Sequence, residues 1–145
     1  MNYRKILFTL LLVFPFLIMA NSYVPGAGKR IYIQDDSYSV IAYIEADGTI
    51  YSNCNSVMGY INSDGSILNS SYGSLGYIES DGRILDSSYD KIAYLNKDGT
   101  VLDITYNPIA YIRSGYVLNR ASSRIMVFDE PVNREWIAVF LIFFY

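Results

Sequence analysis

The chain has 145 residues, of which 52% are hydrophobic and 17% are charged, and its formal net charge is −3. This composition predicts one ordered domain and excludes a largely disordered chain. Lys and Arg are sparse and scattered, so a basic face for nucleic acid is not expected. The sequence has no histidine and one cysteine, Cys54. An imidazole base, an intramolecular disulfide and a cysteine-cluster metal site are therefore excluded.

Residues 1–22 have the pattern of a secretory signal peptide. Arg4 and Lys5 form a positive segment, residues 6–19 are apolar except for Thr9 and Pro15, and Ala20-Asn21-Ser22 is a small-x-small cleavage site. Cleavage after Ala20 is the other option. The alternative is an uncleaved membrane anchor, although the apolar run is shorter than the roughly 20 residues of a spanning helix. We expect an exported protein, periplasmic or extracellular, from which the signal peptide is cleaved.

A 17-residue repeat begins at Ile41. Four full-length copies cover residues 41–57, 58–74, 75–91 and 92–108, and a copy shorter by one residue covers 109–124. A tyrosine recurs at Tyr43, Tyr60, Tyr77, Tyr94 and Tyr111, and an Asp-Gly pair begins at Asp47, Asp64, Asp81 and Asp98. A fixed period of this kind indicates a repeat protein whose copies are supersecondary units. We expect the repeat domain to span residues 23–130.

Each copy has the pattern of a β-hairpin. In the third copy an apolar run ending at Ile78 leads through Ser80-Asp81-Gly82 to a second run that begins at Ile84. Asp-Gly between β-prone runs is a strong hairpin signal, because Gly tolerates a positive φ. Either a two-residue Asp-Gly turn or a three-residue loop fits this pattern. The short copy favours the three-residue loop, because Ser114-Gly115 then remains a permitted two-residue connection.

The three-residue loop also fixes which side chains share a face. Ile78 then faces Ile84, on the same side as a small residue at Ala42, Gly59, Gly76, Ala93 and Ala110. Tyr and Leu side chains lie on the other face, so neighbouring hairpins must cover one another. Residues 30–34 and 125–128 resemble the two halves of a unit and could pair to close a ring. We therefore expect an all-β ring or shallow barrel of about five hairpins.

The pattern changes in residues 131–145. Residues 136–145 are apolar on every side, and a helix of that kind is normally buried. Asn133 suits its N-cap and Glu135 its first turn. A final β-strand and a membrane-contacting tail are the alternatives, since so short an apolar run has no diagnostic period. We expect a short apolar C-terminal helix that fills the centre of the ring.

The unit Gly-Tyr-Ile-x-x-Asp-Gly-x-Ile, at residues 59–67 and 76–84, resembles the repeat of the β-flower proteins of the five-fold type. The resemblance covers about residues 32–128. It implies an exported bacterial protein with a quasi-symmetric barrel of hairpins, similar to the tubby C-terminal barrel with its central apolar helix. It implies no activity and no functional residue. The shortened turn at Ser114-Gly115 and the degenerate flanks depart from the unit and leave the number of hairpins open. Choline-binding repeats are also hairpin arrays, but they are rich in Trp, which is missing from the repeats here.

Several residues could carry chemistry, and each also has a structural interpretation. The turn aspartates Asp47, Asp64, Asp81 and Asp98 could bind calcium or be solvated turn residues. The tyrosine ladder could stack on sugar or pack between neighbouring hairpins. Cys54 is either a free thiol or half of an intermolecular disulfide. Ser70-Ser71 and Ser87-Ser88 have no histidine to activate them.

We therefore predict no catalytic, cofactor-binding or metal-ligating residue and no cofactor. The leading hypothesis is a non-enzymatic exported module, structural or ligand-binding, whose ligand and oligomeric state are open. The alternative is a peripheral membrane or lipid-binding module that uses the apolar C-terminal segment. No nucleic-acid partner is expected.

Overall fold

The computed structural model describes residues 29–129 and 131–145, so the expected signal peptide lies outside the described residues. The described chain forms twelve short strands and then one helix. The elements are β1 (Ile31–Gln34), β2 (Val40–Ile44), β3 (Thr49–Ser52), β4 (Val57–Ile61), β5 (Ser66–Asn69), β6 (Ser74–Ile78), β7 (Arg83–Asp86), β8 (Lys91–Leu95), β9 (Thr100–Asp103), β10 (Pro108–Arg113), β11 (Tyr116–Asn119), β12 (Arg124–Phe128) and α1 (Arg134–Phe143).

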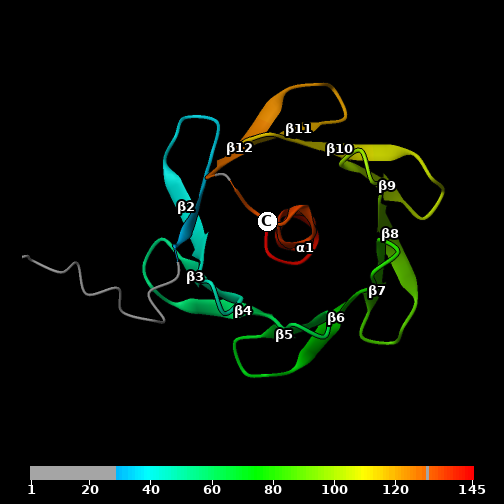
Figure 1. Cartoon of the computed structure of the whole chain (residues 1–145), viewed down its shortest axis with the longest axis horizontal. Helices are drawn as coiled ribbons and strands as arrows, with labels where there is room; N and C mark the ends of the chain where they lie inside the picture. Colours follow the sequence, from blue (N-terminus) through cyan, green and yellow to red (C-terminus); the bar gives the residue numbers. More distant parts are fainter. Residues whose placement is uncertain (1–28, 130) are drawn as a thin grey trace, which may run out of the picture.

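The strands form one closed antiparallel barrel in which each strand pairs with its neighbours in sequence and β1 pairs with β12. Figure 1 shows this ring with α1 inside it. The closing pair aligns Ile33 with Phe128, and the backbone N–H of Asp129 donates to the carbonyl of Tyr32 at 3.2 Å. The predicted pairing of the two flanking segments is therefore confirmed. Closure removes the open sheet edges on which other chains could pair.

The barrel consists of the five expected hairpins and one closing pair of strands. Five hairpins are joined through the x-Asp-Gly turn or its shortened form: β2–β3, β4–β5, β6–β7, β8–β9 and β10–β11. The sixth pair consists of β12 and β1, which come from opposite ends of the repeat domain. This is the pair that the flanking segments were predicted to form, since the second half of the unit precedes the first copy and its first half follows the last.

The x-Asp-Gly turns have the predicted three-residue form. In the β6–β7 hairpin Ile78 pairs with Ile84. The N–H of Glu79 donates to the carbonyl of Arg83, and the N–H of Gly82 donates to that of Glu79, both at 2.9 Å. Gly82 has φ +92°, in the left-handed region that glycine enters without a Cβ clash.

The shortened hairpin β10–β11 keeps the same inward-facing pair. Ile112 pairs with Val117 and Arg113 with Tyr116, which leaves Ser114-Gly115 as a two-residue loop. The missing residue is therefore absorbed by the turn. The register of the strands below the turn does not change, as the sequence pattern predicted.

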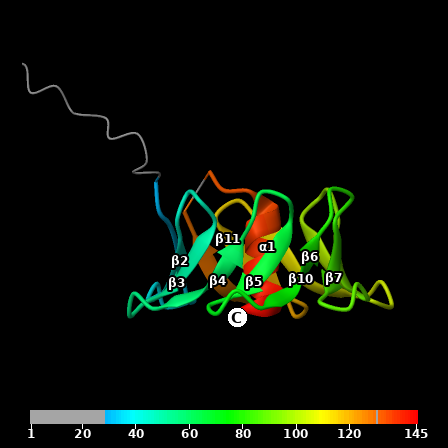
Figure 2. The ribbon, with the colours of Figure 1, turned by 90° about the horizontal axis from the view of Figure 1, so that it is seen from below.

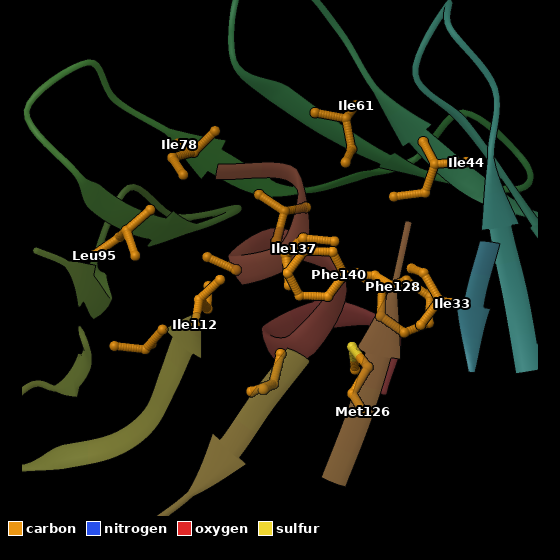
Figure 3. Packing of buried hydrophobic residues seen from close by; sticks show 14 of the residues in the cluster. Ile33, Ile44, Ile61, Ile78, Leu95, Ile112, Met126, Phe128, Ile137 and Phe140 are labelled. Atoms are coloured by element: carbon orange, nitrogen blue, oxygen red, sulfur yellow. The ribbon is translucent and has the colours of Figure 1, made fainter. Parts of the chain in front are cut away.

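The inside of the barrel is filled by aliphatic side chains and by α1. The inward-facing residues Ile33, Ile44, Ile50, Ile67, Ile84 and Ile112 are all fully buried. Ile137, Ala138, Val139 and Phe140 of α1 belong to the same buried cluster. Figure 3 shows Ile137 and Phe140 among side chains contributed by strands from around the ring. The barrel and the helix thus share a single core.

The N-terminal signals predicted for the helix are present in the structure. The side-chain oxygen of Asn133 accepts a hydrogen bond from the N–H of Glu135 at 2.9 Å, and Glu135 lies in the first turn. Figure 2 shows α1 standing along the barrel axis, with the C-terminus at the end opposite the x-Asp-Gly turns. The β-strand alternative for residues 136–145 is therefore wrong.

Two inward-facing glycines make room for the end of the helical segment. A Cβ atom on Gly59 would lie 2.6 Å from Cε1 of Phe144, and one on Gly76 would lie 2.8 Å from Cζ of Phe143. The helical segment therefore comes close to the barrel wall at these two small inward-facing residues. The groups that approach are the phenyl rings at the end of the segment.

The shared core predicts a large effect of Phe140→Ala. This substitution should lower the free energy of unfolding by about 3–5 kcal/mol, because it leaves a cavity where a buried ring was. Deletion of residues 136–145 should unfold or aggregate the chain, since the net stability of a domain is only about 5–15 kcal/mol. Urea denaturation followed by circular dichroism measures both effects, with Tyr145→Ser at the exposed end as the control. A truncated chain that stays soluble and melts cooperatively would contradict this role of α1.

The turn geometry predicts unequal effects at two neighbouring positions. Gly82→Val should destabilise the fold by at least about 1–2 kcal/mol, because a side chain is strained in the left-handed region. A Cβ atom there would also collide with the carbonyl of Leu95 on the next hairpin. Ser80→Thr, in the same turn, should change the urea midpoint very little. Equal midpoints for the two variants would show that the bulged turn is wrong.

Candidate functional site in the outer loops

Six loops, which we call the outer loops, project from the end of the barrel opposite the x-Asp-Gly turns. They cover residues 35–39, 52–56, 69–73, 86–90, 103–107 and 119–123. Figure 1 shows them pointing away from the ring axis, and Figure 2 shows them spreading outward at one end. One such loop follows each of β1, β3, β5, β7, β9 and β11, so the loops are repeated around the whole ring.

All outer loops are closed by the same hydrogen bonds. In the β7–β8 loop the N–H of Tyr89 donates to the carbonyl of Asp86 at 3.0 Å. The carboxylate of Asp86 accepts from the N–H groups of Ser88 and Asp90 at 2.8 and 3.0 Å. The corresponding acceptors in the other loops are Asp35, Ser52, Asn69, Asp103 and Asn119. A polar side chain at the start of each loop therefore accepts hydrogen bonds from backbone N–H groups that have no partner on a neighbouring strand.

The fourth residue of every outer loop has a positive φ, between 61° and 66°. It is a tyrosine in four loops, Tyr38, Tyr72, Tyr89 and Tyr106, and it is Asn55 or Ser122 in the other two. This backbone conformation costs a residue with a side chain roughly 1–2 kcal/mol, and Asn tolerates it better than Tyr. The four tyrosines are nevertheless 57–69% exposed. We call them the loop tyrosines.

Two loop tyrosines lie flat on a second tyrosine. Tyr72 stacks on Tyr60 with ring centres 4.7 Å apart and planes 11° apart, and Tyr89 stacks on Tyr77 at 4.5 Å and 12°. The hydroxyl of Tyr60 donates to that of Tyr72 at 3.1 Å, and this bond raises the pKa of Tyr60. The hydrogen bond from Tyr89 lowers the pKa of Tyr77. Each pair is therefore held by stacking and by its hydroxyl groups.

The other two loop tyrosines are covered by a cation of the chain itself. Nζ of Lys91 lies 4.2 Å from the ring centre of Tyr106 and donates to its hydroxyl at 2.8 Å. Cζ of Arg124 lies 4.8 Å from the ring centre of Tyr38, and its Nη1 donates to that hydroxyl at 2.9 Å. Lys91 and Arg124 both occupy the last position of their repeat copies. Every loop tyrosine thus has a neighbour that fixes the plane of its ring.

The tyrosine ladder predicted from the sequence forms the base of this layer. Tyr43 is buried and stacks on Tyr51 at 4.9 Å, while Tyr60, Tyr77, Tyr94 and Tyr111 are half-buried. These residues pack between neighbouring hairpins. The sequence analysis did not single out the loop tyrosines, although Tyr72, Tyr89 and Tyr106 recur with the same 17-residue period.

The turn aspartates cap the turns to which they belong. Each accepts the backbone N–H of the residue two positions further on, at 2.9–3.1 Å, in Asp47, Asp64, Asp81 and Asp98. All four are exposed. Over residues 29–129 and 131–145, the structure brings together no group of three His, Cys, Asp or Glu side chains that could hold a metal ion.

Two grooves flank the start of α1 at the x-Asp-Gly end of the barrel. The larger, about 340 Å³, lies between α1 and the turns of β4–β5 and β6–β7, and the smaller, about 210 Å³, lies beside the turns of β6–β7 and β8–β9. Asp64, Glu79 and Glu135 make the larger groove acidic, and Trp136 forms part of its wall. Arg83 partly neutralises it, since its Nη2 lies 2.7 Å from the carboxylate of Glu79.

Cys54 lies in an outer loop as an exposed free thiol, and its Sγ contacts the side-chain oxygen of Asn53 at 3.3 Å.

The C-terminal residue is held at the same end of the barrel, where the hydroxyl of Tyr145 donates to the carbonyl of Ile125 at 3.2 Å. Within the part of the chain that the structure describes, α1 is too short to cross a membrane, and no other helix is present.

The architecture defines a class of protein, the closed antiparallel barrel of short hairpins with a C-terminal helix. A family model described as "5-fold beta-flower protein" matches residues 30–145. The chain therefore belongs to the 5-fold β-flower protein family, and the resemblance found in its repeat unit is confirmed. Searches of the curated proteins and of the solved structures found no match.

The capping hydrogen bonds predict how the stability of the fold depends on pH. The Ser66 hydroxyl is the main cause of the lowered pKa of Asp64, and the Thr105 hydroxyl is the main cause of that of Asp103. A depressed folded-state pKa stabilises the fold fully above the unfolded value, here 3.8. The contribution is lost as the pH falls from that value through the folded pKa.

Chemical denaturation between pH 2 and pH 6 should therefore show a stability that is level at the upper end and declines below about pH 4. Asp103→Asn should make this decline shallower, and the loop should still close, because Asn69 and Asn119 play the same capping role in other loops. Superimposable profiles for the two proteins would contradict a role of Asp103 in the acid response.

Proposed function

We propose that the chain is a non-enzymatic, exported module that binds a ligand or partner through its outer loops, with the closed barrel as a rigid scaffold. The observation that carries the proposal is the display of the loop tyrosines. Each holds a large ring at the surface on a backbone conformation that disfavours it.

Energetic considerations support a role for these rings beyond folding. The left-handed backbone costs roughly 1–2 kcal/mol, and an aromatic stack returns about 0.5–1.5 kcal/mol. For Tyr72 and Tyr89, whose rings stack, these two terms largely offset each other. Asn55 and Ser122 occupy the same position in loops with the same closing hydrogen bonds. The loop closes without a tyrosine, so binding is a better reason than folding for the tyrosine to be there.

The scaffold suits this role because its interior is already occupied. Ile137 to Phe140 of α1 fill the centre, which leaves the outer surface for a ligand. Closure of the barrel fixes the outer loops relative to one another. Repeated weak contacts on a rigid ring can add up to firm binding without any deep pocket.

Export and the lack of catalysis rest on the sequence. Residues 1–22 carry the pattern of a signal peptide, and removal of that segment leaves 9 Lys and Arg against 14 Asp and Glu. The chain has no histidine to act as a base for its serine pairs.

A peripheral membrane module is the second candidate, and one observation favours it. Phe143 and Phe144 are only half-buried, and Tyr145 is exposed, at the end of the barrel that bears the outer loops. These rings could touch a bilayer while Ile137 to Phe140 remain in the core. Liposome flotation of the chain and of Tyr145→Ser tests this candidate without disturbing the fold. Flotation that Tyr145→Ser abolishes would favour the membrane over the outer loops.

The principal test uses the cells that naturally produce the chain. We expect the protein outside the cytoplasm, with a mature N-terminus at Asn21 or Tyr23 by mass spectrometry. The chain should sediment with isolated cell-envelope material. A variant with all four loop tyrosines changed to Asn should remain in the supernatant, with an unchanged circular dichroism spectrum and melting curve. A cytoplasmic protein, or sedimentation that the four substitutions leave intact, would overturn the proposal.

A further inference from the structure

We propose that the two stacked pairs, Tyr60–Tyr72 and Tyr77–Tyr89, form a two-site platform for a neutral glycan chain. The inference rests on the proposed binding role of the outer loops and names the class of ligand. It is carried by the geometry of the pairs, by the polar groups beside them and by the cations found at the two other loop tyrosines.

The first step is the shape of the surface. Tyr72 is 69% exposed and Tyr89 is 65% exposed, although each has one face on its partner ring. The opposite face is therefore open, and the near-parallel stacking holds it in a fixed plane. A fixed ring binds with little loss of side-chain freedom, and tyrosine offers a flat apolar face with a polar edge. The carbon-bound hydrogens on one side of a pyranose ring complement that face.

The second step is the supply of polar groups around the rings. Ser70 and Ser71 precede Tyr72, and Ser87 and Ser88 precede Tyr89, and all four serines are exposed. Their loops are closed by the side chains of Asn69 and Asp86. The serine hydroxyls are not needed for that closure. Each can donate and accept, which is what the hydroxyl groups of a sugar require.

The third step is charge. The open face of a tyrosine also attracts cations. At Tyr38 and Tyr106, however, Arg124 and Lys91 already lie over the rings. These two rings are therefore closed to a cationic ligand, and the carboxylates of Asp86 and Asp90 in the loop of Tyr89 would repel an anionic one. The outer loops are therefore better suited to an uncharged ligand.

The fourth step makes an apolar or polyproline ligand less favourable than a glycan. Such ligands bind by burial in a groove lined by apolar or aromatic side chains. The two grooves described above lie beside the start of α1 at the opposite end of the barrel. Four of the six outer loops instead project one tyrosine ring each, which suits a chain that makes one stacking contact per sugar.

The two pairs also occupy the same positions in consecutive hairpins. Tyr60 and Tyr77 are 17 residues apart, as are Tyr72 and Tyr89. A polymer of repeated sugar units can contact both platforms at once. The second contact is then intramolecular, so the polymer should bind far more tightly than its monosaccharide.

Native affinity electrophoresis of the chain tests the inference, with laminarin, xylan, galactomannan or dextran in the gel. At least one polysaccharide should retard the chain, and glucose, xylose or mannose should not compete at equal mass. Tyr72→Asn and Tyr89→Asn should each weaken the retardation several-fold, and the double variant should abolish it. Asn is the matched replacement, because Asn55 holds the same backbone conformation in another loop. Tyr116→Asn, at an exposed tyrosine outside the loops, is the control and should bind normally.

The possible failures separate this inference from the proposed function. If no polysaccharide retards the chain while envelope binding still depends on the loop tyrosines, the glycan is wrong and the binding role stands. If both measurements fail, both proposals fall. Retardation that survives the double variant, or that Tyr116→Asn reduces equally, would overturn the assignment to the two pairs. Displacement of the polysaccharide by a ten-residue polyproline peptide would assign the platform to a peptide and overturn the glycan.

Discussion

The barrel depends on the contact between its inward-facing side chains and α1. Eight strands make a barrel that side chains alone can fill, but twelve strands enclose more space. Without the helix, the ring of buried isoleucines would line a wet channel and lose roughly 1.5–3 kcal/mol of burial for each side chain. The helix in turn is apolar on every side and cannot be stable in water by itself. Ring and helix therefore stabilise each other, and neither is a separate domain.

A single helix cannot contact every hairpin in the same way, and the small inward-facing position reflects this. Gly59 and Gly76 stand where Phe144 and Phe143 come closest, whereas Ala42, Ala93 and Ala110 occupy the same position elsewhere in the ring. A methyl group at either glycine would meet both a phenyl ring and the carbonyl of the neighbouring strand. The two adjacent glycines at this position therefore match the place where the phenyl rings at the end of the helical segment meet the barrel wall.

Some features of the fold depend on a single residue, or on the absence of one, and these could be predicted from the sequence. The short turn at Ser114-Gly115 fixed the hairpin register, and Asn133 with Glu135 marked the start of the helix. The closing pair β12–β1 could be predicted although its halves are far apart in sequence, because each flank keeps the residue pattern of half a unit. The loop tyrosines, in contrast, were not predicted. Periodicity shows that positions are equivalent, but it does not show φ, and Tyr is a residue from which a positive φ is not expected.

The structure separates the residues that build each outer loop from the residue that it displays. The polar side chain at the first position makes the closing hydrogen bonds, and these are the same whether the fourth residue is Tyr89, Asn55 or Ser122. The fourth side chain points outward and contributes little to the core. It can therefore differ between loops without a change in the barrel, which accounts for three residue types at one position of a strict repeat. A scaffold built in this way can hold several rings in fixed planes around its circumference, and its ligand is then decided by side chains on which the fold does not depend.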